Sequence, residues 1–226
     1  MIRFAVMGSK GGVGKSTIVY GISRLLSERY IVTIVDLSSS RTICNVYGVR
    51  GSLMDGHDYI VDQGNLKIIS LYSQLSGNAN LAKFKDIYLD LITETDYLIL
   101  DYGVHLYDKL VSDELIVFYE NMSVPTHLIA VSTPQEFIIS STEKMSESYI
   151  NLVHGIKEDA QVVLEYFVLN MVREKTKFKT LAKPKMGFVE IPFYRDLSFN
   201  GFWNANIPKE IVSMANNFEG FLESRG

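Results

Sequence analysis

The sequence predicts an α/β fold in which a doubly wound, mostly parallel sheet carries helices on both faces. Short apolar runs rich in β-branched residues alternate with longer segments whose apolar residues recur every three or four positions. A glycine-rich stretch separates the first apolar run from the first helical segment, which gives the order strand, loop, helix. No repeat, low-complexity tract or interdomain linker is visible, so we expect a single domain over residues 1–226.

The expected elements follow one another in alternation along the chain. The strands are expected near 2–7, 30–35, 66–71, 97–101, 127–132, 162–169 and 187–191. The helices are expected near 16–28, 80–94, 107–120, 140–156 and 208–223. Residues 49–65 have glycines among polar residues and are expected to be the least structured part of the chain. Ligands of such sheets bind at the carboxyl ends of the strands, where the loop at 8–15 should lie.

Residues 10–17 read Lys-Gly-Gly-Val-Gly-Lys-Ser-Thr and predict a phosphate-binding loop. The glycines allow backbone N–H groups to surround an anion at the N-terminal end of the following helix. Lys15 is expected to reach the β- and γ-phosphates, and the Ser16 hydroxyl to ligate Mg²⁺. The alternative, a glycine turn with surface lysines, is disfavoured by the strand and helix around the motif. The residues expected at the nucleotide phosphates are Lys10, Gly11, Gly12, Val13, Gly14, Lys15, Ser16 and Thr17.

Two aspartates end expected strands beside this loop. Asp36 follows Ile34-Val35, and Asp101 follows the apolar run 97–100. Together with Ser16 they are the expected Mg²⁺ site, with the carboxylates acting through water. A single aspartate in such a place is more often a helix cap or turn residue, but two in register are harder to explain in that way.

The additional lysine of the loop, Lys10, makes it similar to the deviant Walker A motif of the ParA/MinD family of P-loop ATPases. The resemblance implies ATP and Mg²⁺ as ligands and an ATP-dependent homodimer with two nucleotides between its subunits. It implies that Lys10 acts in trans on the partner's nucleotide, so that Lys10 and Lys15 are the expected catalytic residues. Asp101 resembles the Walker B aspartate of this family.

The same resemblance extends toward the C-terminal part of the chain. In the family an asparagine after a strand contacts the adenine edge, and Asn170 follows the expected strand at 162–169. As an isolated residue, an asparagine there would more often belong to a turn. The segment 189–192, which ends at Pro192, resembles the family's segment beside the base. Asn170 and Pro192 therefore complete the expected nucleotide-binding set.

One residue departs from the family pattern. Ser38 stands where relatives usually have an aspartate that helps to orient the attacking water. A serine hydroxyl can bind that water but is a poor base near neutral pH. We therefore expect nucleotide binding to persist and ATP hydrolysis to be slow, or to need a protein activator. Two alternatives stay open: another acid replaces this one, or the alignment shifts by a residue.

Composition limits the other possibilities. The net charge of −4 offers no overall attraction to nucleic acid or anionic lipid, so such binding requires a local patch. The single cysteine excludes an internal disulfide, disfavours an iron–sulfur or similar metal centre, and fits a cytoplasmic protein. No apolar stretch approaches the length of a membrane span. The polar face of the expected C-terminal helix is acidic, so we expect that helix to pack on the sheet and not to anchor the protein to a membrane.

The sequence does not decide whether the protein acts on DNA or on a protein assembly. A basic run is the candidate contact with nonspecific DNA, although such runs are more often solvated loops; its residues are Arg173, Lys175, Lys177, Lys179, Lys183 and Lys185. Phe199, Phe202 and Trp203 could form a docking surface for a protein, part of the core or a wall beside the nucleotide. We expect a slow ATPase switch for DNA partitioning or cellular positioning. The alternatives are an assembly ATPase without DNA binding and a nucleotide-binding module with little hydrolysis.

Overall fold

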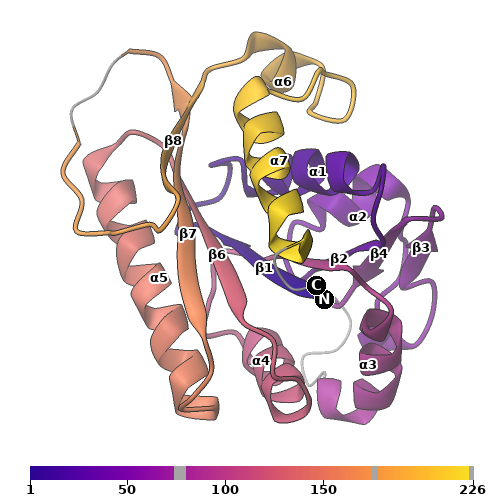
Figure 1. The fold of residues 1–226 in the computed structure, drawn as a ribbon. Coiled ribbons are helices and arrows are strands. Elements are labelled where there is room, and N and C mark those ends of the chain that lie inside the picture. The colour runs from indigo at the N-terminus through magenta and orange to yellow at the C-terminus, as the bar shows by residue number, and fades with distance from the viewer. Residues whose placement is uncertain (74–79, 175–177, 224–226) are drawn as a thin grey trace.

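The computed structural model of the protein describes residues 1–73, 80–174 and 178–223, in three layers with a sheet between helices (Figure 1). Within these residues an eight-stranded sheet has the order β3-β4-β2-β5-β1-β6-β7-β8. The strands are β1 Ile2–Met7, β2 Val32–Asp36, β3 Ile60–Asp62, β4 Leu66–Ser70, β5 Tyr97–Asp101, β6 Thr126–Ser132, β7 Val162–Val172 and β8 Gly187–Pro192. Neighbouring strands are parallel except for β3 and β4. The predicted fold class is confirmed.

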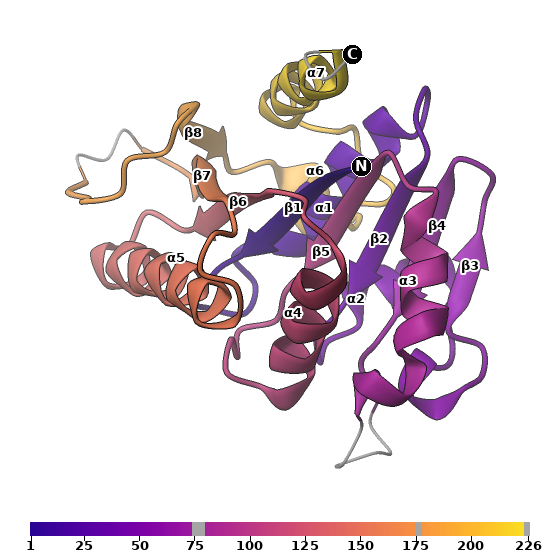
Figure 2. The ribbon, with the colours of Figure 1, turned by 60° about the horizontal axis from the view of Figure 1, so that its bottom comes forward.

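The helices lie on both faces of the sheet, as Figure 2 shows. One face is covered by α1 Lys15–Leu26, α2 Thr42–Tyr47 and α7 Lys209–Glu223. The other is covered by α3 Lys85–Thr93, α4 Lys109–Asn121 and α5 Glu136–Ile156. The remaining helical elements are α6 Arg195–Phe199 and two 3₁₀ turns, η1 Leu53–Asp55 and η2 Leu81–Phe84.

Four short elements, α2, α6, β3 and η1, were not expected from the sequence. Helix α2 has six residues and α6 has five, which is too short for an apolar periodicity to be recognised. Strand β3 has three residues and lies with η1 in the segment 49–65, which we expected to be the least structured. These elements exist because tertiary contacts stabilise them, since an isolated helix of this length is unstable in water.

Strand β1 lies in the middle of the sheet and positions the glycine-rich loop that follows it. All six of its residues are buried, and they alternate between the two apolar layers. The exception to its apolar character is Arg3, whose guanidinium forms an ion pair at 2.8 Å with the buried Glu114 of α4. Tyr88 and Tyr102 donate their hydroxyls to the same carboxylate. These hydrogen bonds compensate the buried carboxylate, while Arg3 Nε has no hydrogen-bond partner among the described residues.

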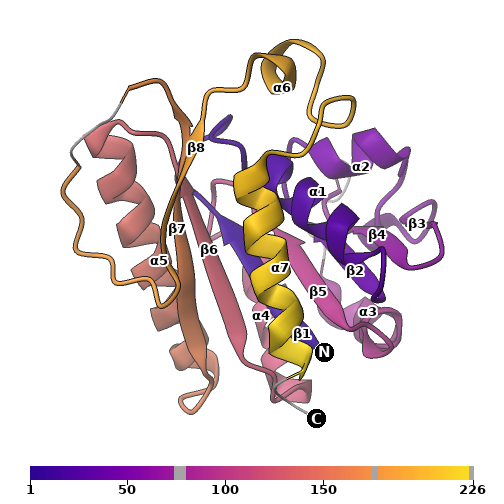
Figure 3. The same ribbon diagram turned by 45° about the horizontal axis from the view of Figure 1, so that its top comes forward.

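Helix α7 packs beside α1 across one face of the sheet (Figure 3). Its apolar residues Ile211, Met214, Ala215 and Phe218 are at most 2% exposed, and Phe218 contacts the Phe4 ring at 4.2 Å between centroids. The expected packing of this helix on the sheet is thus confirmed. Among the described residues, no helix is both long enough and apolar enough to span a membrane.

Candidate functional site

The loop at 8–14 connects β1 to α1 at the carboxyl end of the sheet. Gly12 and Gly14 have φ angles of 77° and 100°, a conformation that glycine adopts without steric strain. Helix α1 begins at Lys15, whose Nζ donates to the carbonyl oxygens of Lys10 at 3.1 Å and Gly8 at 3.4 Å. The ammonium is therefore held under the loop, at the N-terminal end of the helix. This is the arrangement that an anion-binding loop needs.

The expected magnesium ligands meet beside this loop. The Ser16 hydroxyl donates to Asp101 Oδ2 at 2.6 Å. Asp36 and Asp101 are register partners on the neighbouring strands β2 and β5, and both are fully buried. Their proximity follows from topology, because β5 lies between β1 and β2 in the sheet. The structure thus brings together three side chains that the sequence places far apart.

Burial shifts the acid–base properties of this group. It raises the pKa of Asp101 to about 7, helped by the charge of Asp36 and opposed by Ser16 and Lys15. Burial also raises the pKa of Asp36, although hydrogen bonds from Ser38 oppose the shift. The pKa of the Lys15 ammonium is lowered by burial. Two carboxylates in a low-dielectric site repel each other unless a cation balances them.

The donor set of this site fits Mg²⁺. Asp101 Oδ1 is buried and has no hydrogen-bond partner among the described residues. A hydroxyl and two carboxylates are hard oxygen ligands of the type that Mg²⁺ prefers, directly or through water. Burial accounts for both the unsatisfied oxygen and the raised pKa of Asp101, because Ser16 and Lys15 compensate the buried carboxylate only in part.

Ser38 is hydrogen-bonded to Asp36. Its backbone N–H and its hydroxyl both donate to Asp36 Oδ1, at 2.9 and 2.6 Å. The other oxygen of Asp36 accepts from the Cys44 backbone N–H at 3.2 Å. The Ser38 hydroxyl also lies 3.2 Å from that of Ser40. Ser38 therefore fixes the orientation of Asp36 and adds no negative charge of its own to the site.

A cavity of about 350 Å³ opens over Lys15, Ser16, Ser38 and Asp101, whereas Asp36 is not part of its lining. Its lining consists of Gly11, Gly12, Gly14, Lys15, Ser16, Thr17, Ser38, Ser39, Ser40, Thr42, Asp101, Gly103, Val104, Met171 and Phe202. Of the segments after Asp36 and Asp101, only Ser38 was considered from the sequence, although loops at the carboxyl ends of strands commonly line such sites. No sequence pattern indicated that Met171 would line the cavity. The position of Phe202 on the lining agrees with one of the three interpretations of the segment 199–203, a wall beside the nucleotide.

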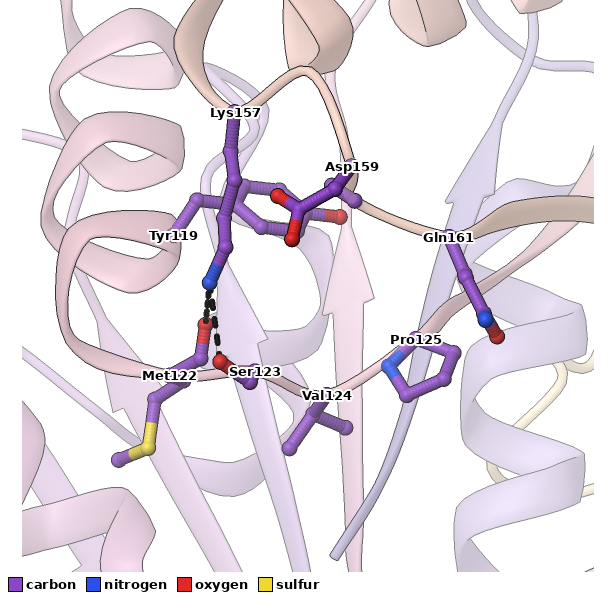
Figure 4. A pocket seen from close by; sticks show the side chains of 9 residues that line it. Tyr119, Met122, Ser123, Val124, Pro125, Lys157, Asp159 and Gln161 are labelled. Atoms are coloured by element: carbon purple, nitrogen blue, oxygen red, sulfur yellow. Dashed lines mark hydrogen bonds between the residues drawn. The ribbon is translucent and has the colours of Figure 1, made fainter.

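A second cavity, of about 260 Å³, lies at the end of the sheet opposite the glycine-rich loop. Figure 4 shows the residues that line it. It is formed where α4 ends before β6 and where α5 ends before β7. Its lysine, Lys157, already donates to the Met122 carbonyl at 3.4 Å and to the Ser123 hydroxyl at 2.9 Å. Parallel sheets bind ligands at the carboxyl ends of their strands, so the cavity over the glycine-rich loop is the candidate site.

The other expected nucleotide residues lie around this cavity and not on its lining. Lys10 is exposed, and its Nζ lies 5.8 Å from the centroid of the Phe137 ring at the start of α5. Asn170 is buried and donates its amide to the Val13 carbonyl at 2.8 Å. Pro192 ends β8 and is exposed. Val13 is buried in the core, with its backbone in the loop.

Comparison with known proteins identifies the family to which the chain belongs. A family profile described as the CobQ/CobB/MinD/ParA nucleotide binding domain matches residues 4–190. The chain belongs to this family. The match extends from β1 to β8 and so includes the loop, both aspartates and Asn170. A comparison with curated proteins found no match.

Solved structures resemble this CobQ/CobB/MinD/ParA protein over almost its whole length. The septum site-determining protein MinD from Pyrococcus horikoshii OT3, complexed with Mg-ADP, has a TM-score of 0.68 and 17% identity, covering 100% of this chain and 98% of that chain. A plasmid partition protein from Borrelia burgdorferi has a TM-score of 0.65 and 15% identity, covering 97% and 98%. Cobyrinic acid a,c-diamide synthase from Mycobacterium smegmatis, with bound ADP and magnesium, has a TM-score of 0.63 and 15% identity, covering 100% and 96%. At these identities the likeness establishes the fold, which is shared by proteins with different roles.

The basic run of this family member lies around the end of β7 and the segment before β8. Arg173, Lys179, Lys183 and Lys185 are exposed, and the Arg173 guanidinium stacks 4.3 Å from the Phe193 ring centroid. Lys175 and Lys177 lie outside the described residues. In the aromatic segment, Phe199 is 79% exposed and Trp203 is 48% exposed, whereas Phe202 faces the cavity and contacts Tyr20.

Proposed function

We propose that this protein binds ATP with Mg²⁺ and hydrolyses it slowly, as a switch between a monomer and an ATP-bound homodimer in the cytoplasm. Lys15 contacts the β- and γ-phosphates, while Ser16, Asp36 and Asp101 hold the Mg²⁺. Lys10 reaches the phosphates bound by the partner subunit. The ATP-bound dimer serves in DNA partitioning or cellular positioning, and an activating protein completes hydrolysis.

The observation that carries this proposal is the hydrogen bond between Ser16, in the first turn of α1, and Asp101, at the end of β5, next to the loop that contains Lys10. The contact supports the proposal because it brings a hydroxyl and a buried carboxylate, both suited to Mg²⁺, together at the N-terminal end of α1, beside the Lys15 ammonium. The exposed side chain of Lys10 supports the dimer, because its ammonium is free of ion pairs with described residues and sits outside the cavity. A cation delivered by a partner stabilises the dimer when phosphate charge is present.

Ser38 supports slow hydrolysis. Its hydroxyl is engaged by Asp36 and cannot act as a general base for the attacking water near neutral pH. A nucleotide-binding module with little hydrolysis is the second candidate that this observation favours. An assembly ATPase that positions a protein machine without binding DNA would use the same nucleotide site, so ATP-dependent binding of DNA is the property that separates it from DNA partitioning.

The proposal is tested by sedimentation velocity of the full chain with Mg-ATP, with Mg-ADP and without nucleotide. We expect a dimer with Mg-ATP and a monomer in the other two states. Lys10→Ala should weaken the ATP-dependent dimer about tenfold or more, because a charge-assisted contact to phosphate is lost. Lys83→Ala removes another exposed lysine, in η2, and should leave the dimer unchanged. A Lys10→Ala protein that dimerises as well as the unaltered chain would contradict the role of Lys10 in trans.

A further inference from the structure

The residue before Lys10 is held by helix α5. The Ser9 backbone N–H donates to the Thr142 hydroxyl at 3.4 Å, and the Ser9 hydroxyl lies 3.0 Å from the same hydroxyl. The Ser9 hydroxyl also donates to the Ile138 carbonyl at 3.5 Å. Because a serine has one hydroxyl proton, the Thr142 hydroxyl donates to that of Ser9 and accepts from the Ser9 N–H. Ile138 and Thr142 are one helical turn apart, so one face of α5 holds Ser9.

Both sides of this contact are packed tightly. Thr142 is fully buried, and α5 packs on β6, the strand beside β1. In the loop, a Cβ added at Gly8 would lie 2.3 Å from the Val131 carbonyl oxygen of β6. The loop therefore has no room to approach the sheet more closely at this point. Ser9 has a defined position between β6 and α5.

The side chain of Lys10 points away from the cavity, toward α5. It is exposed and lies off the cavity lining, and its Nζ is 5.8 Å from the centroid of the Phe137 ring in the first turn of α5. A cation at this distance from an aromatic ring is attracted to it. Lys15 occupies the other side, because its Nζ donates to the Lys10 carbonyl at 3.1 Å. Repulsion between the two ammonium groups favours the same separation.

This geometry determines which phosphates Lys10 can reach. Within one subunit the Lys15 ammonium lies at the cavity, whereas the Lys10 ammonium lies outside it. A bound triphosphate would attract Lys10 inward, and the anchoring of Ser9 opposes that movement. A lysine that swung inward would neutralise the nucleotide of its own subunit. It would then remove the charge attraction by which ATP favours association of two subunits.

We propose that Thr142 is a positioning residue that directs Lys10 away from the nucleotide of its own subunit and so reserves it for the partner's nucleotide. This inference rests on the proposed ATP-dependent dimer and deepens it, because it names the contact that keeps Lys10 available in trans. Thr142 is buried and acts through Ser9 and Lys10, without touching the nucleotide.

The test is sedimentation velocity of the full chain with Mg-ATP. Thr142→Val keeps the shape of the side chain without its hydroxyl and should weaken the ATP-bound dimer about fivefold. Thr142→Ser retains the hydroxyl and should dimerise within about twofold of the unaltered protein. In a Lys10→Ala background, Thr142→Val should cause no further loss, because there is no lysine to position. Ser140→Ala removes an exposed hydroxyl of α5 and should leave the dimer unchanged.

A second measurement separates positioning from damage to the loop. Calorimetric titration with Mg-ADP measures the loop and Lys15 in a state that we expect to be monomeric. Thr142→Val should bind Mg-ADP within about twofold of the unaltered protein. An equal loss of Mg-ADP affinity and dimerisation would show that Thr142 only stabilises the loop, and it would overturn the inference. A further loss of dimerisation in the double variant would overturn it too. Failure of the unaltered chain to dimerise with Mg-ATP would instead overturn the proposed dimer itself.

Discussion

The Ser16 hydroxyl and the Asp101 carboxylate, 85 residues apart in the chain, form a 2.6 Å hydrogen bond at the carboxyl edge of the sheet. The contact joins the first turn of α1 to the end of β5, and Asp36 lies next to Asp101 on β2. It leaves Asp101 Oδ1 buried and without a partner among the described residues. The hydroxyl and the carboxylate are therefore held together in advance at the place where a bound Mg²⁺ would need them.

Replacing the Ser16 hydroxyl should uncouple Mg²⁺ from nucleotide binding. In Ser16→Ala we expect the gain in ATP affinity that Mg²⁺ provides to fall about tenfold, because one oxygen ligand is lost. Ser16→Thr keeps the hydroxyl and should retain the gain. Titration with ATP in Mg²⁺ and again in EDTA measures both affinities for each variant. An undiminished effect of Mg²⁺ in Ser16→Ala would exclude Ser16 as a ligand.

The nucleotide-free protein should lose stability as the pH rises from about 4 to 7. The pKa of Asp101 is raised from 3.8 to about 7, so the folded state binds this proton more tightly than the unfolded chain does. Between these pH values the Asp101 carboxyl is ionised in the unfolded chain but still protonated in the folded protein, so the free energy of unfolding falls as the pH rises. Above pH 7 the carboxyl is ionised in both states, and the free energy of unfolding falls no further on its account. Asp101→Asn cannot ionise, so its thermal midpoint should exceed that of the unaltered protein at pH 8 and match it near pH 4. Equal midpoints at pH 8 would contradict this assignment.

The proton bound by the Asp101 carboxylate should compete with Mg²⁺. A cation beside Asp101 stabilises the ionised carboxylate, so binding of Mg-ATP releases a proton when the pH is below about 7. We expect the affinity for Mg-ATP to fall by up to about tenfold for each pH unit below 7. Calorimetry in two buffers of different ionisation enthalpy counts the released protons. Asp101→Asn should release fewer, whereas the exposed Asp58→Asn should behave like the unaltered protein.

The sequence predicted the parts of the site that local patterns determine. The glycine-rich loop and the acids at strand ends follow from strand, loop and helix signals, and the parallel sheet then brings Asp36 and Asp101 into register. Asp36 and Asp101 both lie at the strand ends that the sequence predicted. The loop segments after these strands, including Ser39 and Gly103, follow from the same topological rule but were not assigned.

The parts that the sequence did not predict depend on contacts between distant segments. The β-bulge that directs Asn170 at Val13 results from packing between β7, β8 and the loop, and no local pattern marks it. Phe202 reaches the cavity because its segment folds back onto Tyr20 of α1. Three interpretations of Phe202 remained open from sequence because an aromatic residue in a glycine-containing segment suits all of them.

Ser38→Asp should accelerate ATP hydrolysis by about tenfold or more, because a carboxylate can orient the attacking water and accept its proton. Steady-state release of phosphate with saturating Mg-ATP measures the turnover. Ser39→Asp is the matched control: Ser39 also lines the cavity, and the substitution adds the same charge one residue away. It should leave turnover within about twofold. If Ser38→Asp leaves turnover unchanged or lowers it, Ser38 does not limit hydrolysis.

The exposed lysines before β8 should determine whether the ATP-bound protein binds DNA. Lys179 and Lys183 flank a segment that Glu143 of α5 fixes by accepting the backbone N–H groups of Leu181 and Ala182 at 2.7 and 3.0 Å. Because the segment is held in place, its cations can contact phosphates at little further cost in chain entropy. Binding of nonspecific duplex DNA over a salt series should require ATP and should decrease steeply as salt is added.

The double variant Lys179→Ala and Lys183→Ala should reduce the slope of log affinity against log salt by about two, one for each lost phosphate contact. The double variant Lys83→Ala and Lys209→Ala removes the same charge at two exposed positions elsewhere and should leave the slope unchanged. An equal effect of both pairs would indicate a general electrostatic response and not a patch. Absence of DNA binding by a protein that dimerises with ATP would favour positioning of a protein assembly, because the switch would then be present without a contact to nucleic acid.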